Sequence, residues 1–315
     1  MTNIQLFCER KNYTNIPLFA AVYQFGRQIK SYNPPGTPEG MRYCFVEHIH
    51  SAFEMIHIIS GAVFIETDDE RLIAFPGDTV IFNPYEPHCG YVNEQHPDVE
   101  YAVMTADLTQ LAPMARKNLV EALAQSKTRC ERCVRDEAIG AQMRVLPEMN
   151  ERTGESGGAE LAMLAGFYSI LAQLDALGCI HHASEREKQL PPFVKKTVDF
   201  LSEHYTENIT TDQISKYFSY NYSYFCRLFK KHFGCSFYTY LTEYRINLAR
   251  GLYMEDAACT LSASEIASKV GFDDYCHFTH DFKRLIGMSP TEYMKKHSPS
   301  RERLLTPDKK LAESS

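Results

Sequence analysis

Several features are missing from this sequence of 315 residues. No apolar run approaches the roughly 18 residues that a membrane-spanning helix needs. The N-terminus, MTNIQLFCERKNYTN, lacks the basic and then apolar pattern of a signal peptide, so we expect a cytoplasmic protein. The ten cysteines show no framework spacing, which argues against a disulfide scaffold. Cys130 and Cys133 form one C-x-x-C in a stretch that looks helical, and two incidental reduced thiols explain it best.

The sequence also lacks a basic excess. Its formal net charge is −7, and the surplus of acidic residues falls within residues 1–190. Residues 191–297 are nearly neutral, which is a weak overall signal for nucleic-acid binding. The places where basic residues cluster therefore carry more information than their total number.

Three regions of the chain differ in pattern. Residues 17–107 contain short runs rich in Val, Ile, Phe and Tyr, separated by Gly/Pro turns, which is typical of a sandwich or barrel. Helical spacing follows, with a stripe of leucines that suits either a core or a dimer seam. We predict an α+β multidomain chain: a β-domain over 1–110, a helical dimerisation region over 111–182, a linker over 183–192, an all-α domain over 193–297 and a disordered tail over 298–315.

The all-α region contains an internal repeat. Residues 229–240 read FKKHFGCSFYTY and residues 282–293 read FKRLIGMSPTEY, so five identical residues recur at an offset of 53. The upstream segments TTDQISKYFSYNYSYFCRLF and SASEIASKVGFDDYCHFTHDF are also parallel, with a one-residue difference in the turn. One helical module therefore occurs twice.

Each copy has the signals of a helix-turn-helix, over 210–232 and 262–285. In the second copy, Ser262 and Glu265 have capping-box spacing, and Gly271 follows where the turn needs a positive φ. In the first copy, Ser219 takes the place of that glycine, and Asn221 is positioned to cap the second helix.

The second helix of each module carries residue types that contact DNA. Arginine can bond to guanine through two hydrogen bonds, while lysine and hydroxyl groups suit phosphates. One such helix could equally be a solvated surface, but two copies that both present basic side chains favour DNA binding. The candidate contacts are Tyr222, Ser223, Cys226, Arg227, Lys230 and Lys231 in the first module, and Tyr275, Cys276, Thr279, His280 and Lys283 in the second.

Residues 193–296 resemble the DNA-binding domain of the AraC/XylS family of transcription regulators. The motif E-I-A-x-x-V-G-F, followed by F and then F-K-[KR]-x-x-G-x-[ST]-P-x-x-Y, is matched at 265–293. The resemblance implies seven helices, a long central helix from about Phe237 to Tyr253, and recognition helices in adjacent major grooves. The sequence departs from the family at His277 and His280, where Tyr and Arg are usual. Histidine still donates to phosphate or guanine, more weakly near neutral pH.

The β-domain has a resemblance of its own. HxHxxxExxxxxxG at 48–61 and PGDTVIFNPYEPH at 76–88 resemble the two sequence blocks of a cupin-type barrel, a jelly roll that many AraC-type regulators carry as a sensor. The resemblance places His48, His50, Glu54 and His88 at the ligand positions of cupin enzymes. Residues two apart on a strand share a face, so both His48 and His50 can point into the barrel. His57 falls on the opposite face and is left out.

Three interpretations of these four residues stay open. They form a divalent-metal site, a metal-free polar pocket for an organic effector, or a structural group satisfied by its neighbours. The family context favours the effector pocket. We therefore predict a dimeric transcription regulator without enzymatic activity, an activator that contacts RNA polymerase and responds to a small molecule. The rival is a metal-dependent cupin enzyme, or a metal sensor, fused to a DNA-binding domain.

Overall fold

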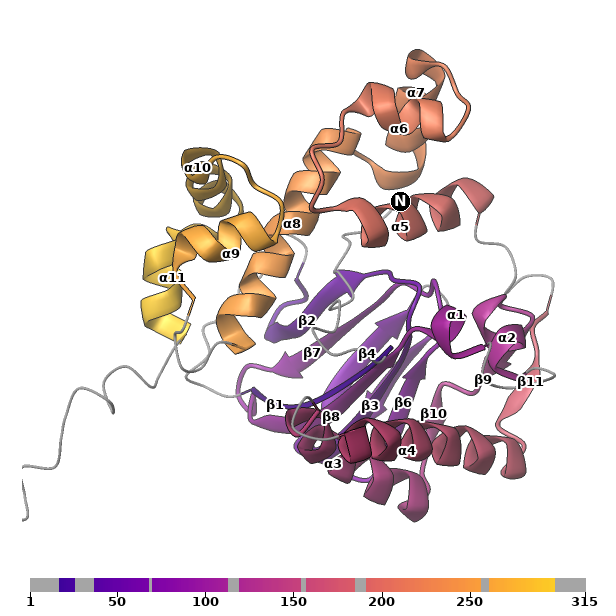
Figure 1. The fold of residues 1–315 in the computed structure, drawn as a ribbon. Helices are drawn as coiled ribbons and strands as arrows, with labels where there is room; N and C mark the ends of the chain where they lie inside the picture. Colours follow the sequence, from indigo (N-terminus) through magenta and orange to yellow (C-terminus); the bar gives the residue numbers. More distant parts are fainter. Residues whose placement is uncertain are drawn as a thin grey trace, which may run out of the picture. The chain divides into compact units, whose positions relative to one another are not determined.

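The computed structural model describes residues 17–25, 37–67, 70–112, 119–153, 157–184, 191–255 and 261–297 (Figure 1). The chain divides into two compact units between Asp199 and Phe200. Most of the predicted linker and the whole predicted tail, residues 185–190 and 298–315, lie outside the described residues. Within the described ranges, no helix combines the length and the apolar character that crossing a membrane requires.

The N-terminal unit is built on two antiparallel sheets. One has the strand order β1-β8-β3-β6-β10 and the other β2-β7-β4-β5. This arrangement confirms the β-domain that the sequence predicts. The strands are β1 (Leu18–Phe25), β2 (Met41–His48), β3 (Phe53–Ser60), β4 (Val63–Thr67), β5 (Arg71–Ala74), β6 (Thr79–Phe82), β7 (His88–Asn93), β8 (Val99–Ala106) and β10 (Cys133–Val134).

Strand β3 shows how the period of two residues divides its side chains between two cores. Ile56 and Ile58 pack with residues of the other sheet, including Val63 and Val92. Phe53 and Met55 face the opposite way and enter a second cluster with the helices. Because both faces of β3 are buried, the strand reads as an almost continuous apolar run.

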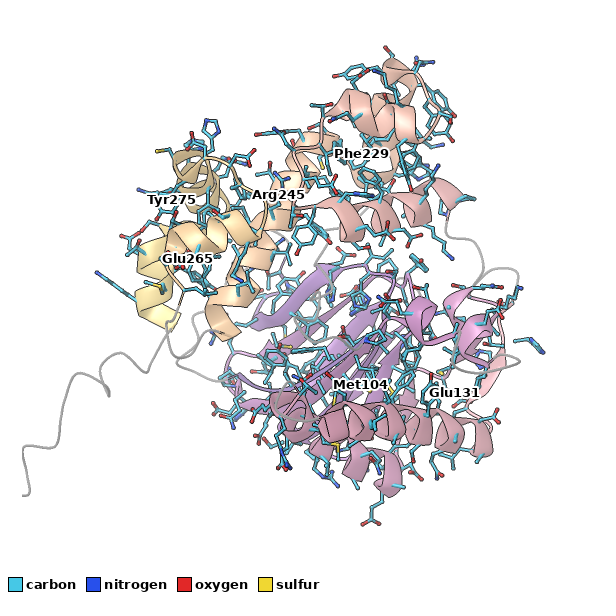
Figure 2. The ribbon with its side chains drawn as sticks, viewed as in Figure 1. Met104, Glu131, Phe229, Arg245, Glu265 and Tyr275 are labelled. Carbon is cyan, nitrogen blue, oxygen red and sulfur yellow. The ribbon has the colours of Figure 1, made fainter. Side chains whose placement is uncertain are left out.

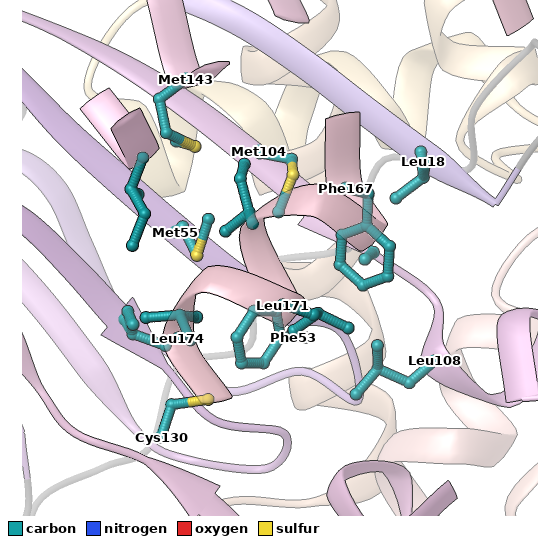
Figure 3. Close-up of a cluster of buried hydrophobic side chains, with 14 of the residues drawn as sticks. Leu18, Phe53, Met55, Met104, Leu108, Cys130, Met143, Phe167, Leu171 and Leu174 are labelled. Carbon is teal, nitrogen blue, oxygen red and sulfur yellow. The ribbon is translucent and has the colours of Figure 1, made fainter. Parts of the chain in front are cut away.

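Two helices, α3 (Glu137–Glu151) and α4 (Gly157–Ala176), cover the outer face of the five-stranded sheet (Figures 1 and 3). Phe167, Leu171 and Leu174 of α4 are buried in the cluster that contains Phe53. Leu161, which the leucine stripe included, is 68% exposed. Most of the stripe is therefore core, and only its first residue faces solvent.

The region predicted to be helical over 111–182 contains strands as well as helices. Helix α1 (Leu108–Leu111) ends at the start of this region, and α2 (Leu119–Ala124) is the first helix that lies within it. The segment TRCERCVRD, expected to be helical, instead contains β9 (Thr128–Cys130) and β10. Strand β10 pairs with β6, and β9 pairs with β11 (Ile180–His182). The helix prediction was wrong because these pairings join residues far apart in the sequence.

The C-terminal unit is all helical, as predicted. Seven helices lie in the described part of residues 191–297, which matches the number implied by the resemblance. The predicted central helix is α8, and its core includes Ile246 and Tyr253 packed against Phe278 and Phe282. The helices are α5 (Pro192–His204), which crosses the division between units, α6 (Thr211–Tyr217), α7 (Tyr222–Phe233), α8 (Phe237–Glu255), α9 (Ala263–Lys269), α10 (Tyr275–Ile286) and α11 (Pro290–His297).

Candidate DNA interface and buried histidine cluster

Both modules have the helix caps that a helix-turn-helix requires. Helix α9 begins with a complete capping box between Ser262 and Glu265, as predicted. Helix α6 begins with a second box between Thr210 and Gln213, which the sequence reasoning did not identify. The second helices start at side-chain caps, Asn221 for α7 and Asp274 for α10.

The turns between the paired helices have matching backbone conformations. Gly271 has φ 90° and Ser219 has φ 57°, so both take up the left-handed conformation that the sequence indicated. A Cβ atom at Gly271 would lie 2.7 Å from the Cα of Thr206 and 2.7 Å from the carbonyl oxygen of Tyr205. The second module therefore needs glycine for space as well as for φ, whereas the first tolerates serine.

Helix α7 buries one face and exposes the other. Phe225, Phe229 and Phe233 recur at intervals of four residues and are buried, which leaves the opposite face to solvent. Arg227 on that face is exposed, and α7 carries no acidic residue. The other predicted contacts Tyr222, Ser223, Lys230 and Lys231 are also exposed, and Cys226 is half-buried.

Helix α10 has the same buried face and a different exposed one. Tyr275, Cys276, His280 and Lys283 are exposed. Thr279, also predicted to contact DNA, is half-buried. Its Oγ1 is shielded from solvent and has no hydrogen-bond partner in the described structure. We therefore no longer expect the Thr279 hydroxyl to contact DNA without rearrangement.

An acidic residue also changes the charge of α10. Asp281 accepts from the guanidinium of Arg284 at 3.0 Å, and its Oδ1 lies 3.5 Å from Nδ1 of His280. Asp281 thereby offsets part of the positive charge beside Lys283. The second module consequently offers a weaker positive surface than the first.

Arg245 ties the second module to the end of α5. From α8, its Nε donates to the carbonyl oxygen of Tyr205 and its Nη2 to that of Glu207, both at 2.7 Å. Its guanidinium also lies over the ring of Phe272, 5.8 Å from the centroid. Figure 2 labels this residue on α8. Sequence reasoning missed it, although an arginine within a largely buried helix was an available signal.

The N-terminal unit brings together the four residues that the cupin-like blocks predict. His48 at the end of β2 is the register partner of His88 at the start of β7, while Glu54 lies on β3 in the other sheet. One potential ligand atom from each of His48, His50, Glu54 and His88 lies within 4.8 Å of all the others. All four side chains are buried. Ligands from both sheets therefore converge on one point.

Backbone carbonyl groups fix two of the imidazole rings. Nδ1 of His88 donates to the carbonyl oxygen of Glu86 at 2.8 Å, and Nδ1 of His50 lies 3.1 Å from the carbonyl oxygen of Ala52. These bonds turn the Nε2 atoms toward the cluster, with that of His50 3.0 Å from Oε2 of Glu54. Burial, helped by the neighbouring His48 and His50, lowers the pKa of His88 well below its ordinary value of 6.5.

His57 shows what a buried structural histidine looks like in the same sheet. Arg144, which can only donate, lies with Nη1 2.8 Å from Nε2 of His57, so that nitrogen accepts. Nδ1 then donates to Oγ1 of Thr79 at 3.0 Å. Both ring nitrogens are satisfied outside the cluster, in agreement with the prediction that His57 lies on the other face.

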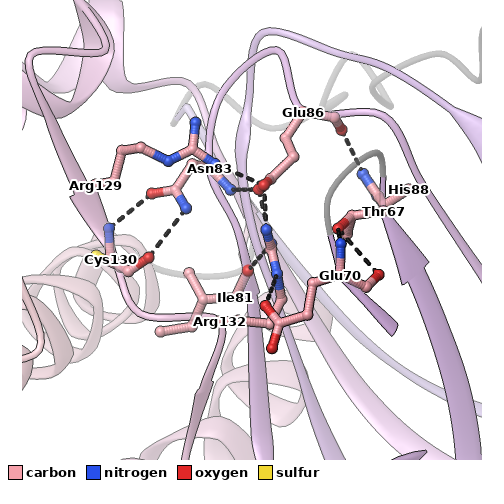
Figure 4. Close-up of polar contacts among 9 residues, drawn as sticks. All are labelled: Thr67, Glu70, Ile81, Asn83, Glu86, His88, Arg129, Cys130 and Arg132. Carbon is pink, nitrogen blue, oxygen red and sulfur yellow. Dashed lines mark hydrogen bonds and ion pairs between the residues drawn. The ribbon is translucent and has the colours of Figure 1, made fainter. Parts of the chain in front are cut away.

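An ionic network holds the loop that precedes His88 (Figure 4). Arg129 donates to Oε1 of Glu86 at 2.6 Å, and Nη1 of Arg132 donates to Oε2 of the same carboxylate at 2.7 Å. Asn83 adds a pair of hydrogen bonds to the backbone of Cys130, at 2.8 and 3.1 Å. The β9–β10 segment thus anchors the loop whose carbonyl group orients His88, a connection that sequence reasoning missed.

Comparison with protein families identifies both halves of the chain. Residues 38–161 match the AraC-like ligand binding domain, and residues 214–296 match a helix-turn-helix domain. The chain belongs to the AraC family of transcription regulators. The cupin-type β-domain and the two-module helical domain predicted from sequence are therefore confirmed as its architecture.

Curated transcriptional regulatory proteins match about a third of the chain by sequence. The transcriptional regulatory protein HptR of Staphylococcus aureus is 34% identical over 103 residues, which is 33% of this chain and 39% of HptR. A response regulatory protein of Staphylococcus epidermidis is 33% identical over an equal length. The chain thus spans 39% of the length of these curated relatives, and their whole activities do not transfer to it directly.

A solved AraC-type structure shares the fold over most of the chain. Apo ToxT of Vibrio cholerae, a variant, matches with a TM-score of 0.56 and 14% identity, covering 90% of this chain and 98% of ToxT. ToxT with a bound unsaturated fatty acid matches with a TM-score of 0.52 and 13% identity, covering 89% and 96%. At this identity the likeness concerns the fold alone.

Proposed function

We propose that this AraC-family chain is a sequence-specific DNA-binding transcription regulator whose N-terminal β-domain senses a small effector. The observation that carries the proposal is the pair of capped second helices, α7 and α10, each with a buried apolar face and an exposed polar face. A generic helical packing unit has no need of basic residues on the exposed face of the second helix in both modules. Two such helices joined by the long α8 can occupy successive major grooves.

The exposed side chains divide into two roles. Arg227, near the middle of α7, has the length and the paired donors to bond with a guanine edge. Lys230, Lys231 and Lys283 lie in the last turns of their helices and suit phosphate oxygens. The tyrosines and serine at the start of α7 add hydroxyl donors. Binding would therefore depend on both salt concentration and sequence.

The buried group of His48, His50, Glu54 and His88 is the proposed sensing site. Its residues come from both sheets, so a ligand bound there would contact both. A few buried polar groups of this kind orient a ligand in its pocket. Ligand binding would favour one arrangement of the chain and so change how the DNA-reading helices are presented.

Dimerisation, activation through RNA polymerase and a cytoplasmic location complete the proposal. The family resemblance implies activation and contact with RNA polymerase. For dimerisation, α3, α4 and the residue after α4 leave Val145, Leu161 and Leu177 exposed at 41–68%. These apolar side chains are the candidates for a contact with a second copy.

Fluorescence anisotropy with a duplex from the gene's own upstream region tests DNA binding. Arg227→Ala combined with Lys283→Ala should weaken binding at least about tenfold and lower the salt slope, since each lost phosphate contact removes about 0.9 from it. Lys295→Ala, an exposed residue on α11, is the control for loss of one charge. A duplex of the same composition in scrambled order tests specificity, and equal affinity for the two duplexes would refute sequence-specific binding. An affinity of the double variant equal to that of the wild type would refute the assigned surface.

A metal-dependent enzyme is the second candidate function. The observation in its favour is the set of three histidines and one carboxylate at metal-ligand distances from one another. Family membership favours the regulator, and we propose no catalytic residues. A reporter-gene assay and a turnover assay with small acids and sugars separate the two candidates. The regulator predicts that the protein changes reporter expression and converts none of these compounds, whereas the enzyme predicts turnover.

A further inference from the structure

We infer that Arg245 sets the spacing at which the two modules read DNA. By holding α8, the end of α5 and the turn of the second module together, it fixes the position of α10 relative to α7. The inference deepens the proposed function and depends on it only for the measurements with DNA. Arg245 lies along α8 between Phe229 of the first module and Tyr275 of the second (Figure 2).

The two modules are joined by one long helix. The N-terminal half of α8 packs on the first module, where the ring centroids of Tyr240 and Phe229 are 5.5 Å apart. Its C-terminal half packs on the second, where those of Tyr253 and Phe282 are 5.8 Å apart. Among the described residues, α7 and α10 pack against α8 and not extensively against each other. Bodies that share only a small contact move relative to one another, so a further connection is needed to hold α7 and α10 at one separation.

The end of α5 supplies that further connection. Toward the first module, the ring centroids of Phe200 on α5 and Tyr217 on α6 are 4.7 Å apart. Toward the second module, a Cβ atom at Gly271 would lie 2.7 Å from the Cα of Thr206, so the turn lies directly against this backbone. The end of α5 and the residues that follow it therefore contact both modules.

Arg245 fastens these residues to α8 and to the second module. Its Nε and Nη2 donate to the carbonyl oxygens of Tyr205 and Glu207, both at 2.7 Å. These carbonyl groups lie just beyond α5, where a helix offers them no partner of its own. The guanidinium also lies 5.8 Å from the ring centroid of Phe272, in the turn of the second module. We call Arg245 with these three partners the Arg245 clamp.

The geometry of the clamp requires arginine. A guanidinium carries five donors in one rigid plane, so it can bond to two carbonyl oxygens and still present its face to an aromatic ring. Lysine has a compact charge on a flexible stem and cannot make the same set of contacts. Burial lowers the pKa of Arg245 below its ordinary value, while Asp273 of the second module opposes the shift. The guanidinium therefore stays charged at neutral pH.

A rigid clamp has a consequence for DNA recognition. One additional base pair between two sites moves the second site by about 3.4 Å along the duplex and turns it by about 34–36°. Two modules held at a fixed separation cannot follow that change, whereas two loosely connected modules can. Arg245 acts here through the position of α10 rather than by touching a base, so it is a positioning residue.

Binding to duplexes of altered spacing tests the inference. One base pair is inserted between the two patches that the full-length protein protects on its upstream DNA. The insertion should weaken binding of the wild type at least about tenfold, because contacts to at least one base pair are lost. Arg245→Met, which removes the donors, should bind the original duplex less tightly and should lose less than about threefold on insertion, because its α10 can follow the shifted site.

Two further variants are controls for this measurement. Arg245→Lys keeps the charge and should give an intermediate loss on insertion. Arg284→Met removes a guanidinium whose hydrogen bonds go to Asp281 of the same helix, so it should distinguish the two duplexes as the wild type does. Simple destabilisation lowers the affinity for both duplexes by the same factor. The ratio of the two affinities therefore reports on spacing alone.

A distance measurement without DNA tests the same point. The exposed Tyr222 and Tyr275, which begin α7 and α10, are each replaced by p-acetylphenylalanine and spin-labelled in the full-length chain. The labelled chain is diluted with unlabelled chain, so that only distances within one chain are measured. Double electron–electron resonance should give a single narrow distance distribution in the Arg245 background and in Arg284→Met. It should give a broad distribution in Arg245→Met.

The outcomes separate this inference from the proposed function. A narrow distribution in folded Arg245→Met, or an insertion that affects the wild type and this variant equally, would overturn the Arg245 clamp. Circular dichroism verifies folding, and Arg245→Lys takes the place of Arg245→Met in both measurements if the latter does not fold. Failure of the wild type to bind the upstream duplex would refute the proposed function, whereas the distance distributions would still support or overturn the clamp.

Discussion

Helices α7 and α10 occupy equivalent positions in the two modules. Each has two buried phenylalanines four residues apart, a lysine directly after the second of them, and a glycine at its C-cap. Their exposed faces differ. Helix α7 presents Arg227 and two further basic residues without an acid, whereas α10 presents His280 beside an Asp281–Arg284 ion pair. The comparison teaches that two modules with the same packing can carry different residues at the positions proposed to contact DNA. We expect the first module to contribute most of the electrostatic attraction and the second to modulate it.

The largest expected effect concerns the turns. Gly271→Ala should lower the free energy of unfolding by roughly 2–5 kcal/mol, since the left-handed conformation costs about 1–2 kcal/mol and backbone overlap adds about 1–3. Ser219→Gly should raise it by no more than about 1 kcal/mol. Urea unfolding of the full chain measures both.

Gly287→Ala is the matched control for this pair. Gly287 has φ 82°, and no described atom beyond its immediate chain neighbours lies within 4 Å of the position that an added Cβ would take, so alanine there meets strain without overlap. Its effect should fall between those of the other two substitutions. If Gly271→Ala were no more damaging than Gly287→Ala, close approach to Thr206 would not distinguish the second turn.

The next effect concerns DNA affinity. Arg227→Ala should cost about 1–3 kcal/mol, or roughly 5- to 150-fold, because a bidentate base contact is lost. His280→Ala should cost less than about fivefold, since His280 is a weaker donor and already lies near Asp281. Anisotropy titrations with one duplex compare the two. A larger loss for His280→Ala would reverse the proposed division between modules.

The smallest effect concerns the caps. Two backbone hydrogen bonds, from His277 and Cys276, hold the pKa of Asp274 below its ordinary value of 3.8. A depressed pKa gives stability that is complete above the ordinary value and is lost as pH falls through the folded value. Asn221, the equivalent cap of α7, does not titrate.

Acid unfolding of matched variants tests this difference. Asp274→Asn should unfold with less pH dependence than the wild type between about pH 5 and about pH 2, and Asn221→Asp should add pH dependence of the same sign. Melting temperatures at each pH give the comparison. Identical pH profiles for all three proteins would show that the Asp274 cap contributes nothing measurable.

Local signals made most of the C-terminal domain predictable. Capping residues and the turn glycine depend on neighbours a few residues apart, and the repeat at an offset of 53 is visible in the sequence itself. The reach of Arg245 to Tyr205 and Glu207 crosses about 40 positions, and its carbonyl partners leave no trace in residue type. The inward placement of the Thr279 hydroxyl likewise depends on packing rather than on spacing.

The strands and the histidine cluster of the N-terminal domain could be predicted from the sequence. The β10–β6 pairing and the ion pairs of Glu86 could not. A short run rich in Phe and Ile next to turn residues identified β3, and the two motif blocks identified His48, His50, Glu54 and His88. The pairing of Cys133 with Val80 and the ion pairs of Glu86 with Arg129 and Arg132 are non-local. The motif blocks placed these four residues at the ligand positions of cupin enzymes, while the family context favoured an organic effector.

Footprinting of the full-length protein on its upstream DNA with hydroxyl radicals tests the central claim most directly. If both modules read DNA, each bound chain should protect two patches on one face, about 10–10.5 base pairs apart. Arg227→Ala should weaken the patch assigned to α7 more than Lys283→Ala weakens the other. Protection of a single patch would contradict the account. So would the absence of protection at protein concentrations that retard the duplex in a gel-shift assay.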